Sequence, residues 1–69
     1  MKNGSLTKLK VKRMMLGFTQ KQMARMLKWS LPYYNQVENG RLVPTNDRKI
    51  QLGEFFGDEF EWLMEEQYI

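Results

Sequence analysis

Apolar residues recur at helical spacing in five stretches of the chain, and no segment has the alternation of a convincing strand. Glycine, asparagine and proline separate the stretches, as expected for turns. No repeat, low-complexity tract or linker interrupts them. The pattern predicts an all-α fold: one compact five-helix domain over residues 1–69. The expected helices cover residues 5 or 6–16, 20–27, 30–39, 46–56 and 58–64.

The first predicted helix carries a charge in an unusual place. Leu6, Leu9 and Leu16 define its apolar face at the 3.6-residue period. Arg13 falls in the middle of that face, where an unpaired charge is unfavourable. Glu38 is the first acidic residue in the chain, so we expect it to form a structural ion pair with Arg13. The alternative is that Arg13 extends along the apolar surface to water.

The second and third helices are predicted to lie close together in the chain. Thr19 and Gln22 form a capping-box pattern at the start of the second helix. Ser30 is a good N-cap for the third. Only a few residues around Lys28 and Trp29 remain between them. This spacing is typical of a helix-turn-helix.

The third predicted helix presents an amide-rich side without acids. That side is formed by Pro32, Asn35, Gln36 and Asn39, with Leu31 and Tyr33 at its shoulders. Asparagine and glutamine can form paired hydrogen bonds with adenine, and an uncharged face enters a groove without electrostatic penalty. An ordinary solvent-facing surface would more often contain glutamate and lysine. The composition of this side therefore favours a DNA-recognition helix.

Turn and capping signals also define the C-terminal part of the chain. The fourth helix is expected after Thr45 and is stopped by Gly57. Gly53 within it indicates close contact with another helix. Asp58 and Glu61 form a second capping-box pattern, which places the start of the fifth helix.

Charge is distributed unevenly along the sequence. The net charge is +3, but residues 1–37 contain eight basic side chains and no acid. Residues 38–69 contain eight acids and three basic side chains. A basic half suits a polyanion such as nucleic acid, and an acidic half would orient its approach. The alternative is that these charges are simply solvated helix faces.

Composition excludes several classes of site. The chain has no cysteine and no histidine, which excludes disulfides, thiolate metal sites and the commonest catalytic base. No apolar run approaches the ~18 residues of a membrane span. We expect a soluble, cytoplasmic protein that binds no metal and needs no small-molecule cofactor. No combination of nucleophile, base and metal ligands indicates an enzyme.

A joint motif extends over about four-fifths of the chain. It consists of Gly17-Phe18-Thr19-Gln20, Met23-Ala24, Leu27, Ser30, Tyr34, Val37-Glu38-Asn39-Gly40, Pro44 and Phe56-Gly57. In this motif and its spacing the sequence resembles the lambdoid phage repressors and Cro proteins, the XRE-like helix-turn-helix family. The resemblance implies a sequence-specific regulator of transcription, of phage, mobile-element or other prokaryotic origin. It also implies that the third helix enters the major groove of double-stranded DNA.

The resemblance assigns roles to individual positions. Gln20 would touch the phosphate backbone and steady the third helix, and Leu31, Pro32 and Gln36 would reach base edges. Asn39 and Arg41 would contact phosphates, and Arg13 with Glu38 matches a buried pair of that family. A homodimer on DNA would form around the fifth helix, near Trp62. The complete predicted DNA-binding set is Thr19, Gln20, Leu31, Pro32, Tyr33, Asn35, Gln36, Asn39 and Arg41.

Three departures from the family pattern alter these expectations. Lys28 stands where the family usually has glycine, so it is expected to adopt a positive φ at modest cost. Leu31 and Pro32 replace polar base-contacting residues, so contact with thymine methyl groups or recognition of DNA shape is expected there. Lys49 occupies a position that is usually apolar.

A function of another class competes with DNA binding. The same helical scaffold could be a protein-interaction module, such as an antitoxin or antirepressor. Aromatic side chains expected at the surface, Trp29, Tyr33 and Trp62, and the acidic C-terminal half favour that alternative. The basic N-terminal half, the amide-rich side of the third helix and Gln20 favour DNA.

Overall fold

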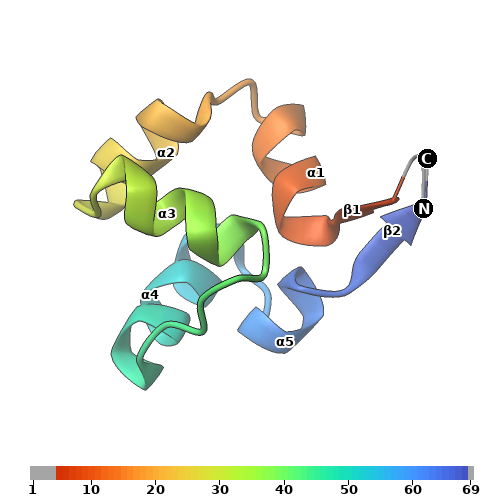
Figure 1. Ribbon diagram of the computed structural model, residues 1–69. Helices are drawn as coiled ribbons and strands as arrows, with labels where there is room; N and C mark the ends of the chain where they lie inside the picture. The colour runs from red at the N-terminus through yellow and green to blue at the C-terminus, as the bar shows by residue number, and fades with distance from the viewer. Residues whose placement is uncertain (1–4, 69) are drawn as a thin grey trace.

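Five helices and a two-stranded sheet make up the protein in a computed structural model that describes residues 5–68 (Figure 1). The elements are β1 (Ser5–Thr7), α1 (Lys8–Met15), α2 (Gln20–Leu27), α3 (Leu31–Glu38), α4 (Asn46–Phe56), α5 (Phe60–Leu63) and β2 (Glu66–Tyr68). The prediction of a compact, mostly helical domain with five helices is confirmed. The predicted domain range of 1–69 includes residues 1–4 and 69, which lie outside the described residues.

The small sheet contradicts the expectation that the chain contains no strand. β1 and β2 pair in antiparallel fashion, with Thr7 opposite Glu66. Figure 1 shows the two strands next to each other, at the ends of the described chain. The first helix consequently begins at Lys8 and not at residue 5 or 6. The Thr7 hydroxyl caps it by accepting a hydrogen bond of 3.2 Å from the backbone N–H of Lys10.

The core is formed by one inward side of each helix. Its buried apolar members are Leu9, Met23, Ala24, Leu27, Trp29, Tyr34, Val37, Leu52 and Leu63. The inward stripes predicted for the second and third helices lie within this set. Because α2 and α3 both contribute to the same core, neither helix can shift without disturbing the other.

Two apolar residues lie elsewhere than the sequence pattern predicted. Leu16 was expected in the core but is 56% exposed. It is the C-cap of α1, and Gly17, at a φ of 81°, turns the chain away towards α2. Trp29 was expected at the surface but is only 7% exposed. Its indole N–H donates a 3.1 Å hydrogen bond to the Gln51 side chain of α4, which fixes the ring between the helices.

The connection between α4 and α5 differs from the predicted capping box. Asp58 does not cap α5; the N-cap residue is Glu59, whose side chain makes no capping hydrogen bond. The Asp58 carboxylate instead forms an ion pair with Lys12 of α1, which also donates to the Phe56 carbonyl at 3.4 Å. A Cβ on Gly53 would lie 2.7 Å from the Asp58 carbonyl oxygen, so the glycine permits this close approach of backbone to α4.

Arg13 and Glu38 form a buried ion pair between α1 and the end of α3. Arg13 is 7% exposed and Glu38 1% exposed. The Arg13 Nε donates to a Glu38 carboxylate oxygen at 2.7 Å, and its Nη1 donates to the Phe18 carbonyl at 2.6 Å. The Tyr34 hydroxyl donates to the same carboxylate at 2.6 Å. Each buried charge is therefore paired and hydrogen-bonded, which is the condition for burying it.

Tyr34 is held in its neutral, donating form by this environment. Burial, followed by the hydrogen bond to Glu38 and the negative charge of that carboxylate, raises the pKa of the Tyr34 hydroxyl well above its usual value. The hydroxyl consequently remains a hydrogen-bond donor through the physiological pH range.

We expect the two charges of the buried pair to be strongly coupled. Changing one partner alone, Arg13→Met or Glu38→Leu, should lower the free energy of unfolding by about 3–5 kcal/mol, because the remaining charge is buried without its partner. The double substitution should be much milder than the sum of the two. Chemical denaturation of the four proteins gives this double-mutant cycle.

The ion pair of Lys8 with Glu65 provides the matched control. Its N···O distance is 2.9 Å, but the two side chains are 23% and 58% exposed. The same cycle on this pair should give a coupling of about 0–1 kcal/mol. Additive effects of Arg13→Met and Glu38→Leu would contradict an energetic role for the buried pair.

Candidate nucleic-acid interface

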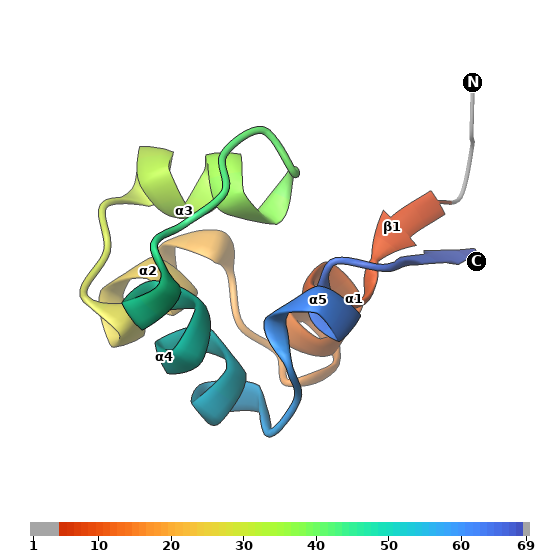
Figure 2. The same cartoon turned by 90° about the horizontal axis from the view of Figure 1, so that it is seen from below.

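Side-chain caps begin both α2 and α3, which a short turn joins. The Thr19 hydroxyl accepts from the backbone N–H of Gln22 at 3.1 Å, and the Gln22 side chain accepts from the backbone N–H of Thr19 at 2.8 Å. The capping box predicted for the second helix is therefore present. At the start of α3 the Ser30 hydroxyl accepts from the backbone N–H of Tyr33 at 3.3 Å. Figure 2 shows α3 at the outer edge of the molecule, with α2 and α4 on one side of it.

Lys28 gives the turn its direction. Its φ of 62° and ψ of 37° are left-handed, as the substitution of lysine for the usual glycine led us to expect. Among residues 5–68 it has the one positive φ outside glycine. This conformation costs a side-chain-bearing residue about 1–2 kcal/mol. The exposed lysine thus places a positive charge in the turn at the expense of some stability.

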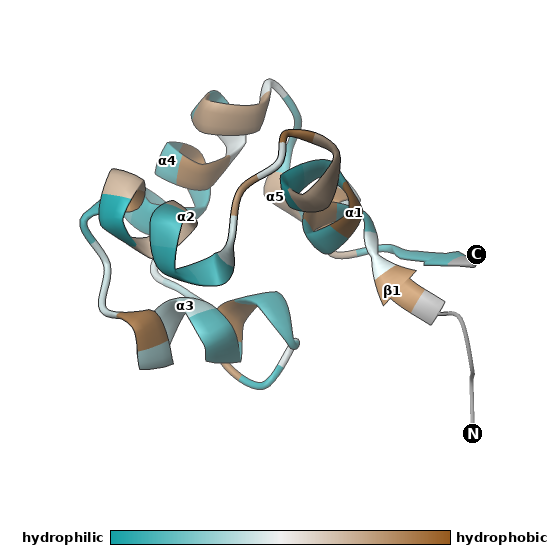
Figure 3. Ribbon diagram, turned by 90° about the horizontal axis from the view of Figure 1, so that it is seen from above, coloured by the Kyte–Doolittle hydropathy of each residue, from teal (hydrophilic) through white to brown (hydrophobic). Residues whose placement is uncertain are grey.

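The outward side of α3 contains part of the predicted DNA-binding set. Leu31, Pro32, Gln36 and Asn39 are exposed there. Tyr33 and Asn35 are only partly exposed, so they are less accessible than the sequence indicated. In Figure 3 the ribbon of α3 shows mainly hydrophilic colours after its apolar first turn. The open surface is therefore apolar at the start of the helix and carries amides further along.

Gln20 connects the start of α2 to α3. Its amide nitrogen donates to a Glu38 carboxylate oxygen at 2.7 Å. Its amide oxygen accepts from the Asn35 side chain at 3.0 Å. The Asn35 side-chain oxygen in turn accepts from the Asn39 side chain at 3.0 Å. A row of amides therefore runs from α2 along α3 and fixes the outward side of that helix.

This arrangement was compared with known proteins. Residues 7–69 match the family described as a helix-turn-helix domain. The chain belongs to this helix-turn-helix family. The match is of the XRE/Cro type and extends over nearly the whole chain, in agreement with the resemblance drawn from the motif. No curated protein and no solved structure matched the chain.

The helix-turn-helix unit is a DNA-binding domain, and several of its basic side chains are exposed. Lys21 and Arg25 are exposed on α2, and Lys28 is exposed in the turn. Arg41 is exposed just after α3, and its backbone N–H donates to the Gln36 carbonyl at 2.8 Å. This hydrogen bond anchors the loop that carries Arg41 to the C-terminal end of α3.

Arg48 was not identified from the sequence, although it lies beside the helix-turn-helix unit. It is exposed in the first turn of α4, and the carbon of its guanidinium group lies 4.4 Å from the centre of the Tyr33 ring. The sequence does show a basic residue three positions after the Thr45 cap, which could have been considered as a contact to an anionic partner. Nothing in the sequence, however, brings positions 33 and 48 together.

Two other kinds of site are absent from the described part of the chain. Within residues 5–68, no group of three or more acidic, histidine or cysteine side chains is arranged to hold a metal ion. Each described helix is too short or too polar to cross a membrane. The α2–α3 surface is thus the candidate functional site that the structure supports best.

Proposed function

We propose that this protein is a sequence-specific regulator of transcription, a repressor from a phage, mobile element or other prokaryotic system acting in the cytoplasm on double-stranded DNA. The observation that carries the proposal is the exposed amide side of α3, which Gln20 and Asn35 hold against α2. Preorganised hydrogen-bonding groups on a helix suit the major groove, where each base pair presents a distinct pattern.

In this proposal the outward residues divide into two groups. Gln36 contacts a base edge, with adenine as the preferred partner, and Leu31 with Pro32 packs on thymine methyl groups. The phosphate backbone is contacted by the N-terminal turn of α2 around Thr19 and Gln20, and by Asn39 and Arg41 beyond the other end of α3. Contacts of the first group would specify sequence, and those of the second would position the protein.

The proposal predicts tight, specific binding to a short duplex. Fluorescence anisotropy titrations against DNA flanking the gene should give higher affinity than scrambled DNA of equal length. Affinity should fall steeply as salt rises, because bound lysines and arginines release counterions from the phosphates. Equal binding to scrambled DNA at all salt concentrations would contradict the proposal.

Base and phosphate contacts should separate by mutation. Gln36→Ala should weaken binding to the best site by about 1–3 kcal/mol and relax the preference among site variants. Arg41→Ala should weaken all sequences similarly and reduce the salt slope by about one unit. The two proteins serve as controls for each other, and an exchange of their effects would mean that α3 is docked differently.

The protein-interaction alternative is less well supported than the sequence suggested. Of the three aromatic residues that favoured it, Trp29 is buried and Tyr33 is covered on one face by Arg48. Trp62 remains 37% exposed. Of the three aromatic side chains that favoured an antitoxin or antirepressor, only Trp62 is therefore available to a protein partner.

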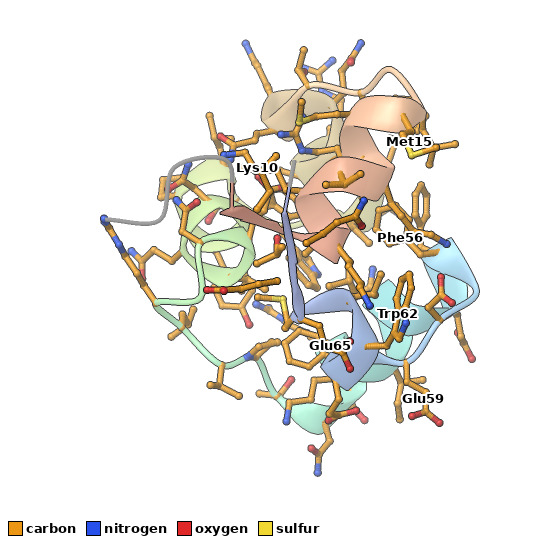
Figure 4. The ribbon with its side chains drawn as sticks, turned by 90° about the vertical axis from the view of Figure 1, so that its right-hand side faces the viewer. Lys10, Met15, Phe56, Glu59, Trp62 and Glu65 are labelled. Atoms are coloured by element: carbon orange, nitrogen blue, oxygen red, sulfur yellow. The ribbon has the colours of Figure 1, made fainter. Side chains whose placement is uncertain are left out.

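We further propose that the protein binds DNA as a homodimer through an apolar face that includes Trp62. Met15 and Leu16 at the end of α1 line a hollow with Lys12 and with Phe55 and Phe56 of α4. Trp62 of α5 adjoins this hollow, because the Lys12 ammonium group lies 5.4 Å from the centre of its ring. Figure 4 shows Met15, Phe56 and Trp62 in a row on one side of the molecule. Met15 is 80%, Leu16 56% and Phe55 40% exposed, and apolar side chains exposed next to one another favour coverage by a second copy.

Dimer formation predicts cooperative binding to two half-sites about 10 base pairs apart, centre to centre. Trp62→Ala should reduce that cooperativity and leave the affinity for a single half-site and the fold unchanged. Ile50→Ala, an exposed apolar residue outside this face, is the matched control. Native mass spectrometry that detects one protomer per two-half-site duplex would contradict the dimer.

A further inference from the structure

Arg48 occupies a defined position on two aromatic rings. Its guanidinium carbon lies 4.4 Å from the centre of the Tyr33 ring and 5.8 Å from that of Trp29. Both distances are within the range of cation–π attraction. An exposed arginine normally samples many rotamers, so this contact restricts where its charge is found.

The aromatic support is itself rigid. Tyr33 packs edge-on against Trp29, with ring centres 5.1 Å apart and planes at 88°. Trp29 is 7% exposed, and its indole N–H is hydrogen-bonded to Gln51. Gln51 in turn donates to the Leu27 carbonyl at 2.8 Å, at the end of α2. The guanidinium group therefore rests on a surface anchored to both α2 and α4.

The charge of Arg48 is not neutralised within the described chain. Ion pairs in residues 5–68 join Lys8 to Glu65, Lys12 to Asp58 and Arg13 to Glu38, and Arg48 belongs to none of them. The N–H donors of a guanidinium lie in its plane, and contact with a ring does not use them up, so they can form two parallel hydrogen bonds with a phosphate.

Arg48 lies beside the N-terminal end of α3. Tyr33 is in the first turn of α3, and Arg48 is in the first turn of α4. In helix-turn-helix complexes the N-terminal residues of the recognition helix contact the bases, so the sugar–phosphate strands pass near that end. Arg41 lies beyond the opposite end of α3.

We infer that Arg48 binds a backbone phosphate of duplex DNA at the N-terminal end of α3, and that Tyr33 is a positioning residue which holds the Arg48 guanidinium with its ring. This inference depends on the proposed function for the docking of DNA on α3. It gives Tyr33 a role different from the direct DNA contact expected from the sequence. Arg48 and Arg41 would then hold α3 on the DNA backbone at its N-terminal and C-terminal ends, respectively.

A phosphate contact is independent of sequence, so a mixed-sequence duplex tests it. Arg48→Ala should weaken binding about tenfold at low salt and reduce the slope of log affinity against log salt by about one unit. Lys49→Ala is the matched control, because it removes the same charge from the next residue of α4. The Lys49 ammonium nitrogen lies 5.4 Å from the centre of the Phe60 ring of α5. Because this contact directs the Lys49 charge towards α5 and not towards α3, Lys49→Ala should leave the salt slope unchanged.

The role of Tyr33 is tested by two substitutions measured in the same way. Tyr33→Phe keeps the ring face and should bind as the unchanged protein does. Tyr33→Leu removes the ring and should lose most of what Arg48→Ala loses, with little further loss when the two are combined. Thermal unfolding of each variant verifies that the domain stays folded at the titration temperature.

The outcomes distinguish this inference from the proposed function. Salt-independent or absent binding of the unchanged protein to duplex DNA would overturn both. Normal binding with equal slopes for Arg48→Ala and Lys49→Ala would overturn only the phosphate contact. Loss of affinity in Tyr33→Phe, or additive losses for Tyr33→Leu and Arg48→Ala, would show that Tyr33 contacts DNA itself and is not a support.

Discussion

The carboxylate of Glu38 is the group on which the arrangement of the helix-turn-helix depends. It accepts hydrogen bonds from Arg13 of α1, Gln20 of α2 and Tyr34 of its own helix. A buried carboxylate needs such donors, and their positions dictate how three helices meet. The orientation of the outward side of α3 is thus fixed from inside the protein, by a charge that is itself buried.

The side chains exposed near α3 differ in kind from those exposed near α1 and α5. On and beside α3, amide and basic side chains are exposed. The single acidic residue of this helix, Glu38, is buried. Between α1 and α5, Lys8 and Lys12 form ion pairs with acids and lie over the Trp62 ring, and apolar side chains beside them are exposed. Among the described residues, exposed basic side chains beside α3, where the proposed DNA contact lies, are therefore free of ion pairs, and basic side chains between α1 and α5 form ion pairs that stabilise the fold.

Short-range signals in the sequence were sufficient for most of the fold. The first residues of α2, α3 and α4 could be predicted from their N-caps Thr19, Ser30 and Thr45, because a cap involves residues only a few positions apart. Apart from Leu16, which a local turn exposes, the failures involve partners distant in sequence: β1 with β2, Asp58 with Lys12, and Tyr33 with Arg48. Each of these depends on how helices pack, which local patterns do not specify.

The two tryptophans occupy contrasting surroundings, and this has a spectroscopic consequence. Trp29 is enclosed under Tyr33 and Arg48 at the α3 end, whereas Trp62 is partly open and lies 4.6 Å from the Lys8 ammonium group. A soluble quencher such as iodide will reach Trp62 and leave Trp29 largely emissive. Intrinsic fluorescence can thus report separately on events at the recognition helix and at α5, without any added label.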